Sequence, residues 1–445
     1  ERLSAFYPNA AYDFYGTPSS PLCVYKTGEP WFVPTGPESQ RIIREARPVR
    51  QDHPVQDHWA EIGKELYTLL NDKKVRWTGR TFLPLLFWIG VEPASLSFED
   101  ARTAAAAATV LLESFGLKEF EIGFRESIVT RSNSNPKMLS YYSPDPPDPL
   151  RPLRPSTKDS MLDLRKPFTP ILGLPISSPI GEGTGALYLR ESEGSNRIYL
   201  LTCSHVVRPE NDKLSSSHRK DLHDKISAPG PTGYQKAIQR IETTIQKGSP
   251  KVANLQLVGK TAKAEALKQK VRLARNLRIE IQKNLGDPEA RVMGEVTYAP
   301  PMRASADSTG SIYLEDWALI ELDNDKFNWT TFKGNQVYVR PELYLDMMYP
   351  NENNRHNRVF PANGLLQVAN VISKEDFYNP QHLDKNGNKC MFVLKNGLTT
   401  HTTFGCTTGM ESIICNGLDV EPKAIAIYPY SDEGPPGPSP TVAVA

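Results

Sequence analysis

Long apolar runs are missing from this chain, which has no stretch of about 18 consecutive apolar residues and no apolar core of a signal peptide. We therefore expect no membrane-spanning helix and no secretory leader, and we expect an intracellular, cytoplasmic protein. An excess of charge of one sign is missing too, because 52 Lys and Arg stand against 51 Asp and Glu. From this balance we expect neither nucleic acid nor a membrane as a partner.

Cysteine is scarce as well. The five cysteines are widely spaced and form no Cys-x-x-Cys pair; they are Cys23, Cys203, Cys390, Cys406 and Cys415. Their odd number and their spacing argue against a disulfide scaffold and against a zinc site. We therefore expect a reducing compartment, no metal and no other cofactor.

Proline is abundant, with 38 residues, and its clusters divide the chain into segments. Residues 56–132 combine helical spacing of apolar residues with one alternating stretch, which predicts a small α+β unit. Within it, Ser97-Phe98-Glu99-Asp100 resembles a helix capping box, and Gly116 is placed to end that helix. We predict an irregular segment at 1–55, the α+β unit at 56–132, a proline-rich linker at 133–167, an all-β domain at 168–430 and a disordered proline-rich tail at 431–445.

One segment, 233–285, interrupts the β pattern. It carries an apolar stripe at steps of three or four residues, which predicts helix; the stripe consists of Leu267, Val271, Ala274, Leu277, Ile281 and Leu285. Gly248-Ser249-Pro250 breaks the segment, so we expect a helical hairpin. Two interpretations remain open: an exposed insertion with solvated Lys and Arg side chains, or a contact arm for a protein partner.

His205 is the first candidate for chemistry. A Gly-rich strand begins at Gly183, a turn follows at 193–196, and His205 lies just beyond the apolar run Ile198–Thr202. A histidine at a strand end can act as a general base, and it can equally be a packing or surface residue.

Asp316 is the second candidate, at the start of the apolar run Trp317-Ala318-Leu319-Ile320. Such an acid can hold a histidine base in one tautomer, or it can be an ordinary turn residue. The order of His205 before Asp316 fits chymotrypsin-like enzymes. We predict that the two side chains lie within hydrogen-bonding reach, about 2.6–3.2 Å between heavy atoms.

Two motifs carry a family resemblance: Thr202-Cys203-Ser204-His205-Val206-Val207 and Asp316-Trp317-Ala318-Leu319-Ile320 resemble the histidine and aspartate strands of trypsin-like peptidases. Arg291–Tyr298 predicts a further barrel strand. Met391–Gly405 resembles a hairpin of the second barrel, with His401 where glycine is expected.

Residues 168–430 together resemble the basidiomycete-type, trypsin-like peptidase domain of large fungal proteins, and Trp88–Pro93 and Phe124–Ser127 resemble their leading unit. The resemblance implies a mostly β, chymotrypsin/trypsin-like double β-barrel. It also implies that the second barrel is incomplete, with a helical-hairpin insertion and a small N-terminal α+β unit.

The nucleophile of that family lies in Gly-Asp-Ser-Gly, which occurs nowhere in this chain. Ser439 is a weak fallback, because Pro438 and Pro440 offer no N–H groups for an oxyanion hole. Ser431 lacks a glycine elbow, and Cys406 fits a buried core cysteine better than a nucleophile. We expect that the chain is truncated or that its end was misread from the gene.

The resemblance therefore implies a serine endopeptidase fold with His205 as base and Asp316 as its orienting acid, inactive for want of a nucleophile. The alternative is a non-catalytic pseudoprotease that acts as a binding or scaffold module. A polypeptide substrate or a protein partner is expected in either case.

Overall fold

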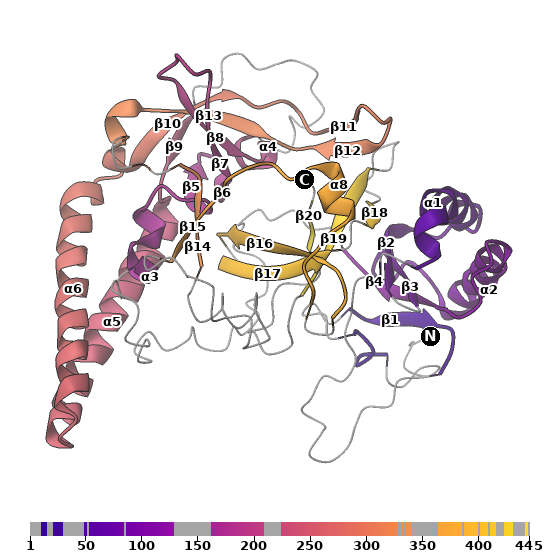
Figure 1. The fold of residues 1–445 in the computed structure, drawn as a ribbon, viewed down its shortest axis with the longest axis horizontal. Helices are drawn as coiled ribbons and strands as arrows, with labels where there is room; N and C mark the ends of the chain where they lie inside the picture. The colour runs from indigo at the N-terminus through magenta and orange to yellow at the C-terminus, as the bar shows by residue number, and fades with distance from the viewer. Residues whose placement is uncertain are drawn as a thin grey trace.

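In the part of the chain that the structure describes, the β-strands form two large sheets and a two-stranded one (Figure 1). This computed structural model describes residues 10–15, 21–29, 49–50, 53–83, 86–128, 162–208, 224–327, 329, 332, 334–339, 364–384, 387–398, 401–407, 410–414, 422–429 and 441–443. The β-rich fold predicted from the sequence is confirmed.

The N-terminal part is a mixed sheet covered by two helices, α1 (Val55–Asp72) and α2 (Phe98–Ser114) (Figure 1). Ile62, Leu66 and Leu70 lie on one face of α1, and their burial against the sheet forms a continuous apolar core. The strands follow the order β1-β4-β3-β2 and are β1 (Cys23–Lys26), β2 (Trp77–Leu83), β3 (Leu86–Val91) and β4 (Glu121–Glu126).

Helix α2 begins and ends where the sequence predicts. The Ser97 hydroxyl oxygen accepts the backbone N–H of Asp100 at 3.1 Å, which satisfies one orphan donor of the first turn. Gly116, two residues beyond the helix, has a φ of +79°, a conformation that favours glycine and stops the helix.

The prediction of irregular structure at 1–55 is wrong for residues 23–26, which form β1 and pair with β4. A strand of four residues is too short for alternation to be recognised in a proline-dotted segment. The sheet also continues beyond the unit predicted at 56–132, because β2 pairs with β18 (Glu411–Ile414), with Arg80 opposite Ile413. N-terminal and C-terminal strands therefore share one sheet.

A seven-stranded antiparallel sheet forms the centre of the predicted all-β part, in the order β6-β5-β9-β10-β13-β8-β7. Its two end strands, β6 and β7, are consecutive pieces of chain separated by Ala186. The sheet therefore curls round until its ends meet, which gives it a barrel-like character. Its strands are β5 (Leu174–Ser178), β6 (Gly181–Gly185), β7 (Leu187–Arg190), β8 (Ile198–Thr202), β9 (Lys225–Ser227), β10 (Val292–Tyr298) and β13 (Ala318–Leu322).

Helices α5 (Pro231–Leu257) and α6 (Thr261–Leu285) form the predicted hairpin, inserted between β9 and β10. The predicted break at Gly248-Ser249-Pro250 is wrong, because α5 continues through Pro250. A proline in a helix removes one N–H, and here the helix continues for a further seven residues and ends before Gly259, whose φ is +69°.

The base of the hairpin is anchored by an apolar cluster in which Ile241, Leu277 and Ile281 pack with Leu164 and Phe168. Leu164 belongs to α3 (Leu162–Arg165), which is followed by a short 3-10 turn, η3 (Lys166–Phe168). The linker predicted at 133–167 is therefore helical in its last residues, and its remainder lies outside the described residues. The tip of the hairpin points away from the barrel (Figure 1).

The C-terminal strands complete the larger sheet around β19, which pairs with β12, β17, β18 and β20. The prediction of a disordered tail is wrong for residues 441–443, which form β20 with Val442 opposite Ala426. A short strand can pair with the backbone of an exposed strand edge without any recognisable side-chain pattern of its own. The remaining elements are β11 (Arg303–Ala306), β12 (Ile312–Glu315), β14 (Gln336–Tyr338), β15 (Leu365–Gln367), α8 (Lys374–Tyr378), β16 (Met391–Gly397), β17 (His401–Thr407), β19 (Lys423–Pro429), β20 (Thr441–Ala443), η5 (Glu289–Arg291) and η6 (Asn324–Lys326).

Candidate active site

His205 lies in a short helix, α4 (Ser204–Val207), directly after β8. Val206 and Val207 are buried in the barrel core, so the segment that carries His205 is fixed from below. Two backbone carbonyl groups also accept hydrogen bonds from side chains of this segment. The Ser204 hydroxyl donates to the carbonyl of Pro300 at 2.5 Å, and the buried Arg208 guanidinium donates to the carbonyl of Ala299 at 2.6 Å.

Gly183 on β6 lets α4 pack closely onto the barrel. A Cβ atom at this position would lie 2.6 Å from both methyl carbons of Val206, far inside van der Waals contact. The Ser178 hydroxyl on β5 donates to the carbonyl of Val206 at 2.7 Å. The Gly-rich strand noted in the sequence therefore has a local reason: it makes room for the segment that carries His205.

Asp316 lies at the junction between β12 and β13, opposite the end of β8. Strands β8 and β13 pair in antiparallel fashion with Thr202 opposite Ala318, so the chain that leaves β8 meets the chain that enters β13. Next to Asp316, the Trp317 ring packs on Tyr298 with 5.1 Å between centroids.

The structure brings the two predicted site residues into direct contact. Nδ1 of His205 lies 2.5 Å from Oδ2 of Asp316, and the backbone N–H of His205 donates to Oδ1 at 3.0 Å. The side chains are 9% and 13% exposed, so the contact is largely shielded from water. Because an ionised carboxylate can accept hydrogen bonds but cannot donate them, Nδ1 carries the hydrogen and Nε2 is left as the basic nitrogen.

Cys203 also belongs to this site, and sequence reasoning did not select it. Its Sγ lies with a nitrogen of His205 and an oxygen of Asp316 in a group whose atoms are all within 4.8 Å of one another. Sulfur, nitrogen and carboxylate oxygen form a possible zinc ligand set. Cys203 is an exposed residue, but desolvation of its thiol and then the neighbouring Asp316 charge raise the pKa of this thiol to about 12. Nucleophilic attack needs the thiolate, so this environment opposes a role for Cys203 as nucleophile.

The other thiol that the sequence raised, Cys406, is confirmed as a core residue. Cys406 is 5% exposed in β17, and Cys390 beside it is fully buried. A hydrogen bond with Cys390, together with burial, raises the pKa of Cys406 well above its ordinary value. Ser431 and Ser439 lie outside the described residues.

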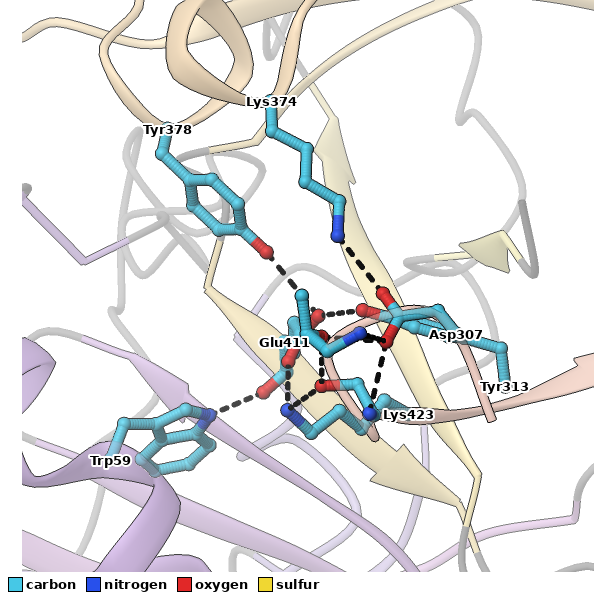
Figure 2. A network of polar contacts seen from close by, with 9 residues as sticks. Trp59, Asp307, Tyr313, Lys374, Tyr378, Glu411 and Lys423 are labelled. Carbon is cyan, nitrogen blue, oxygen red and sulfur yellow. Dashed lines mark hydrogen bonds and ion pairs between the residues drawn. The ribbon is translucent and has the colours of Figure 1, made fainter. Parts of the chain in front are cut away.

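A second polar cluster fixes the strand that leads into Asp316 (Figure 2). At its centre is Glu411 on β18, whose side chain is 13% exposed. The Glu411 carboxylate accepts the hydroxyl of Tyr313 on β12 and the ammonium of Lys423 at 2.7 Å. Its backbone carbonyl accepts the indole N–H of Trp59 from α1 at 2.5 Å. Tyr313 is three residues before Asp316. The cluster therefore links α1 and β18 by hydrogen bonds to β12, the strand that precedes Asp316.

The same cluster extends to a turn after β11 (Figure 2). Oδ1 of Asp307 accepts the backbone N–H of Thr309 at 2.8 Å, and Oδ2 accepts the Lys374 ammonium of α8 at 2.9 Å. Hydrogen bonds from Thr309 and then from Lys374 hold the pKa of Asp307 well below its ordinary value. Nothing in the spacing of Glu411 or Asp307 singles them out in the sequence, because their partners come from distant segments.

No family model matches this chain, and a search of curated proteins found no similar one. Among the helices of the described residues, none has the length and apolar character needed to cross a bilayer.

Proposed function

We propose that this protein has the fold of a chymotrypsin-like serine endopeptidase, with His205 as the general base and Asp316 as the acid that orients it. The observation that carries the proposal is the 2.5 Å contact between Nδ1 and Oδ2, made by residues 111 positions apart. The antiparallel barrel-like sheet behind them and the chain order of the two residues support it.

Under this proposal, each group has a separate task. Asp316 accepts the Nδ1 hydrogen, so Nε2 of His205 can take a proton from an attacking hydroxyl and later return it to a leaving amine. The carboxylate also stabilises the imidazolium ion that forms between these two steps. The second hydrogen bond, from the His205 backbone N–H to Oδ1, limits rotation of the carboxylate and so helps to maintain this orientation.

The sequence contains no Gly-Asp-Ser-Gly, so we propose that the chain as given does not hydrolyse peptides. The missing motif favours a second candidate function, a pseudoprotease that binds a protein partner through the same fold. Both candidates share the His205–Asp316 pair, and they differ in whether the fold also binds a protein partner.

A fluorophosphonate probe, which reacts with activated serine hydroxyls, tests the proposal. We expect no covalent labelling of the purified protein, and no difference between the unchanged chain and its His205→Ala variant. Labelling that disappears in His205→Ala and persists in the control His58→Ala would overturn the inactive assignment, because it would reveal a working nucleophile. His58 suits the control because it is a half-exposed histidine on α1. Labelling that persists in both variants would contradict the role of His205.

A further inference from the structure

The near-zero net charge of the chain hides a strong separation of charge. Residues 231–285, the α5–α6 hairpin, contain 12 Lys and Arg and 3 Asp and Glu, a net charge of +9. From totals of 52 and 51, the rest of the chain keeps 40 basic and 48 acidic residues, a net charge of −8. The hairpin is therefore a basic arm on an acidic body.

The tip of the hairpin, residues 243–264, has basic side chains and no acidic ones. Residues 243–264 contain no Asp or Glu and carry four exposed lysines: Lys247, Lys251, Lys260 and Lys263. In contrast, the shaft has neutralising contacts, such as the 2.7 Å ion pair between Arg278 and Glu242. Within the described residues, no ion pair is found for Lys247, Lys260 or Lys263.

The tip also exposes two large apolar side chains. Leu257 is 84% exposed and Val258 is 65% exposed, at the end of α5 and in the turn before α6. This turn between α5 and α6 is the end of the hairpin that points away from the barrel (Figure 1). Lysines around aliphatic side chains suit a surface with anionic groups outside and an apolar layer beneath. The ammonium groups would interact with the anionic groups, and the aliphatic side chains with the apolar layer.

We propose that the hairpin tip docks on an anionic lipid bilayer, with Leu257 and Val258 entering the interface and the lysines facing the headgroups. A nucleic-acid surface fits less well, since the tip has no arginine for bidentate contacts and no aromatic ring for base stacking. The docking is peripheral and reversible. It is independent of the His205–Asp316 site, because the tip is at the opposite end of the hairpin from the barrel.

The lysines are tested by sedimentation of the full chain with vesicles. Each lysine near an anionic surface strengthens binding by about fivefold. We therefore expect a triple variant, Lys247→Gln, Lys260→Gln and Lys263→Gln, to bind equimolar phosphatidylserine–phosphatidylcholine vesicles about a hundredfold more weakly. The matched control neutralises three exposed lysines of the N-terminal part, Lys64, Lys73 and Lys118, and should bind like the unchanged protein. Equal losses in both triple variants would overturn the proposal, because they would show that binding follows total charge alone.

The apolar side chains are tested with Leu257→Ser and Val258→Ser in one chain. We expect this variant to bind vesicles more weakly than the unchanged protein. The difference should remain at high salt, because screening removes the contribution of the lysines but not that of the apolar side chains. Binding of the unchanged protein to phosphatidylserine vesicles that equals its binding to pure phosphatidylcholine would overturn the proposal. So would tight binding of a single-stranded oligonucleotide, lost in the triple lysine variant, without binding to the anionic vesicles.

Discussion

Replacing Asp316 by alanine removes two hydrogen bonds at once and should strongly destabilise the barrel. The carboxylate accepts Nδ1 of His205 at 2.5 Å and the His205 backbone N–H at 3.0 Å, in a site where both side chains are largely buried. A hydrogen bond to a charged group contributes about 1.5–3 kcal/mol, and breaking a buried charged pair costs about 3–5 kcal/mol. We therefore expect Asp316→Ala to lower the free energy of unfolding by about 3–5 kcal/mol.

Asp316→Asn separates the two contributions. Asparagine keeps one carbonyl oxygen for the backbone N–H of His205 and loses the negative charge beside Nδ1, so the expected loss is about 1–2 kcal/mol. Urea unfolding followed by near-ultraviolet circular dichroism measures both changes. The control is Asp325→Ala, an exposed acid of η6 with an expected change of about 0.5 kcal/mol or less. If Asp316→Ala is no more destabilising than Asp325→Ala, the buried contact does not exist in solution.

Three further changes have expected outcomes. Gly183→Ala places a Cβ 2.6 Å from the Val206 methyl carbons and should lower the free energy of unfolding in urea by about 1–3 kcal/mol. Adding Val206→Ala should restore part of this loss. An unchanged free energy of unfolding in Gly183→Ala would refute the close packing. Desolvation and the hydrogen bond to Glu411 raise the pKa of Tyr313, so its contribution to stability is full below about pH 10 and is lost at higher pH. Tyr313→Phe should flatten this alkaline loss, and an unchanged slope would contradict it. Because its pKa is raised, the Cys203 thiol should react with iodoacetamide at pH 8 at least about tenfold more slowly than a peptide cysteine, as followed by mass spectrometry. An ordinary rate at this exposed residue would refute the raised pKa.

The strands next to the candidate site could be predicted because their signals are local. Ile198–Thr202 and Ala318–Leu322 are short apolar runs, and both become barrel strands whose residues alternate between buried and half-buried positions. Their antiparallel pairing brings the end of one to the start of the other, so His205 and Asp316 meet. The contact itself was predicted from the resemblance of the two motifs to the histidine and aspartate strands of trypsin-like peptidases.

Features that depend on long-range pairing could not be predicted in the same way. Strands β1 and β20 are short, and each is stabilised by a distant partner strand rather than by its own pattern. The Glu411 cluster joins residues from α1, β12 and β19, and no one of these segments reveals it. The low intrinsic helix preference of proline predicts a break at Pro250, yet α5 continues past it.

The most direct test of the His205–Asp316 pair is nitrogen-15 NMR of the imidazole ring of His205. We expect the hydrogen on Nδ1, with its resonance shifted far downfield by the carboxylate at 2.5 Å, in the unchanged protein and in Asp325→Ala. This signal should be lost in Asp316→Ala. A His205 ring with its hydrogen on Nε2, unchanged by the loss of Asp316, would contradict the proposed base and its orienting acid.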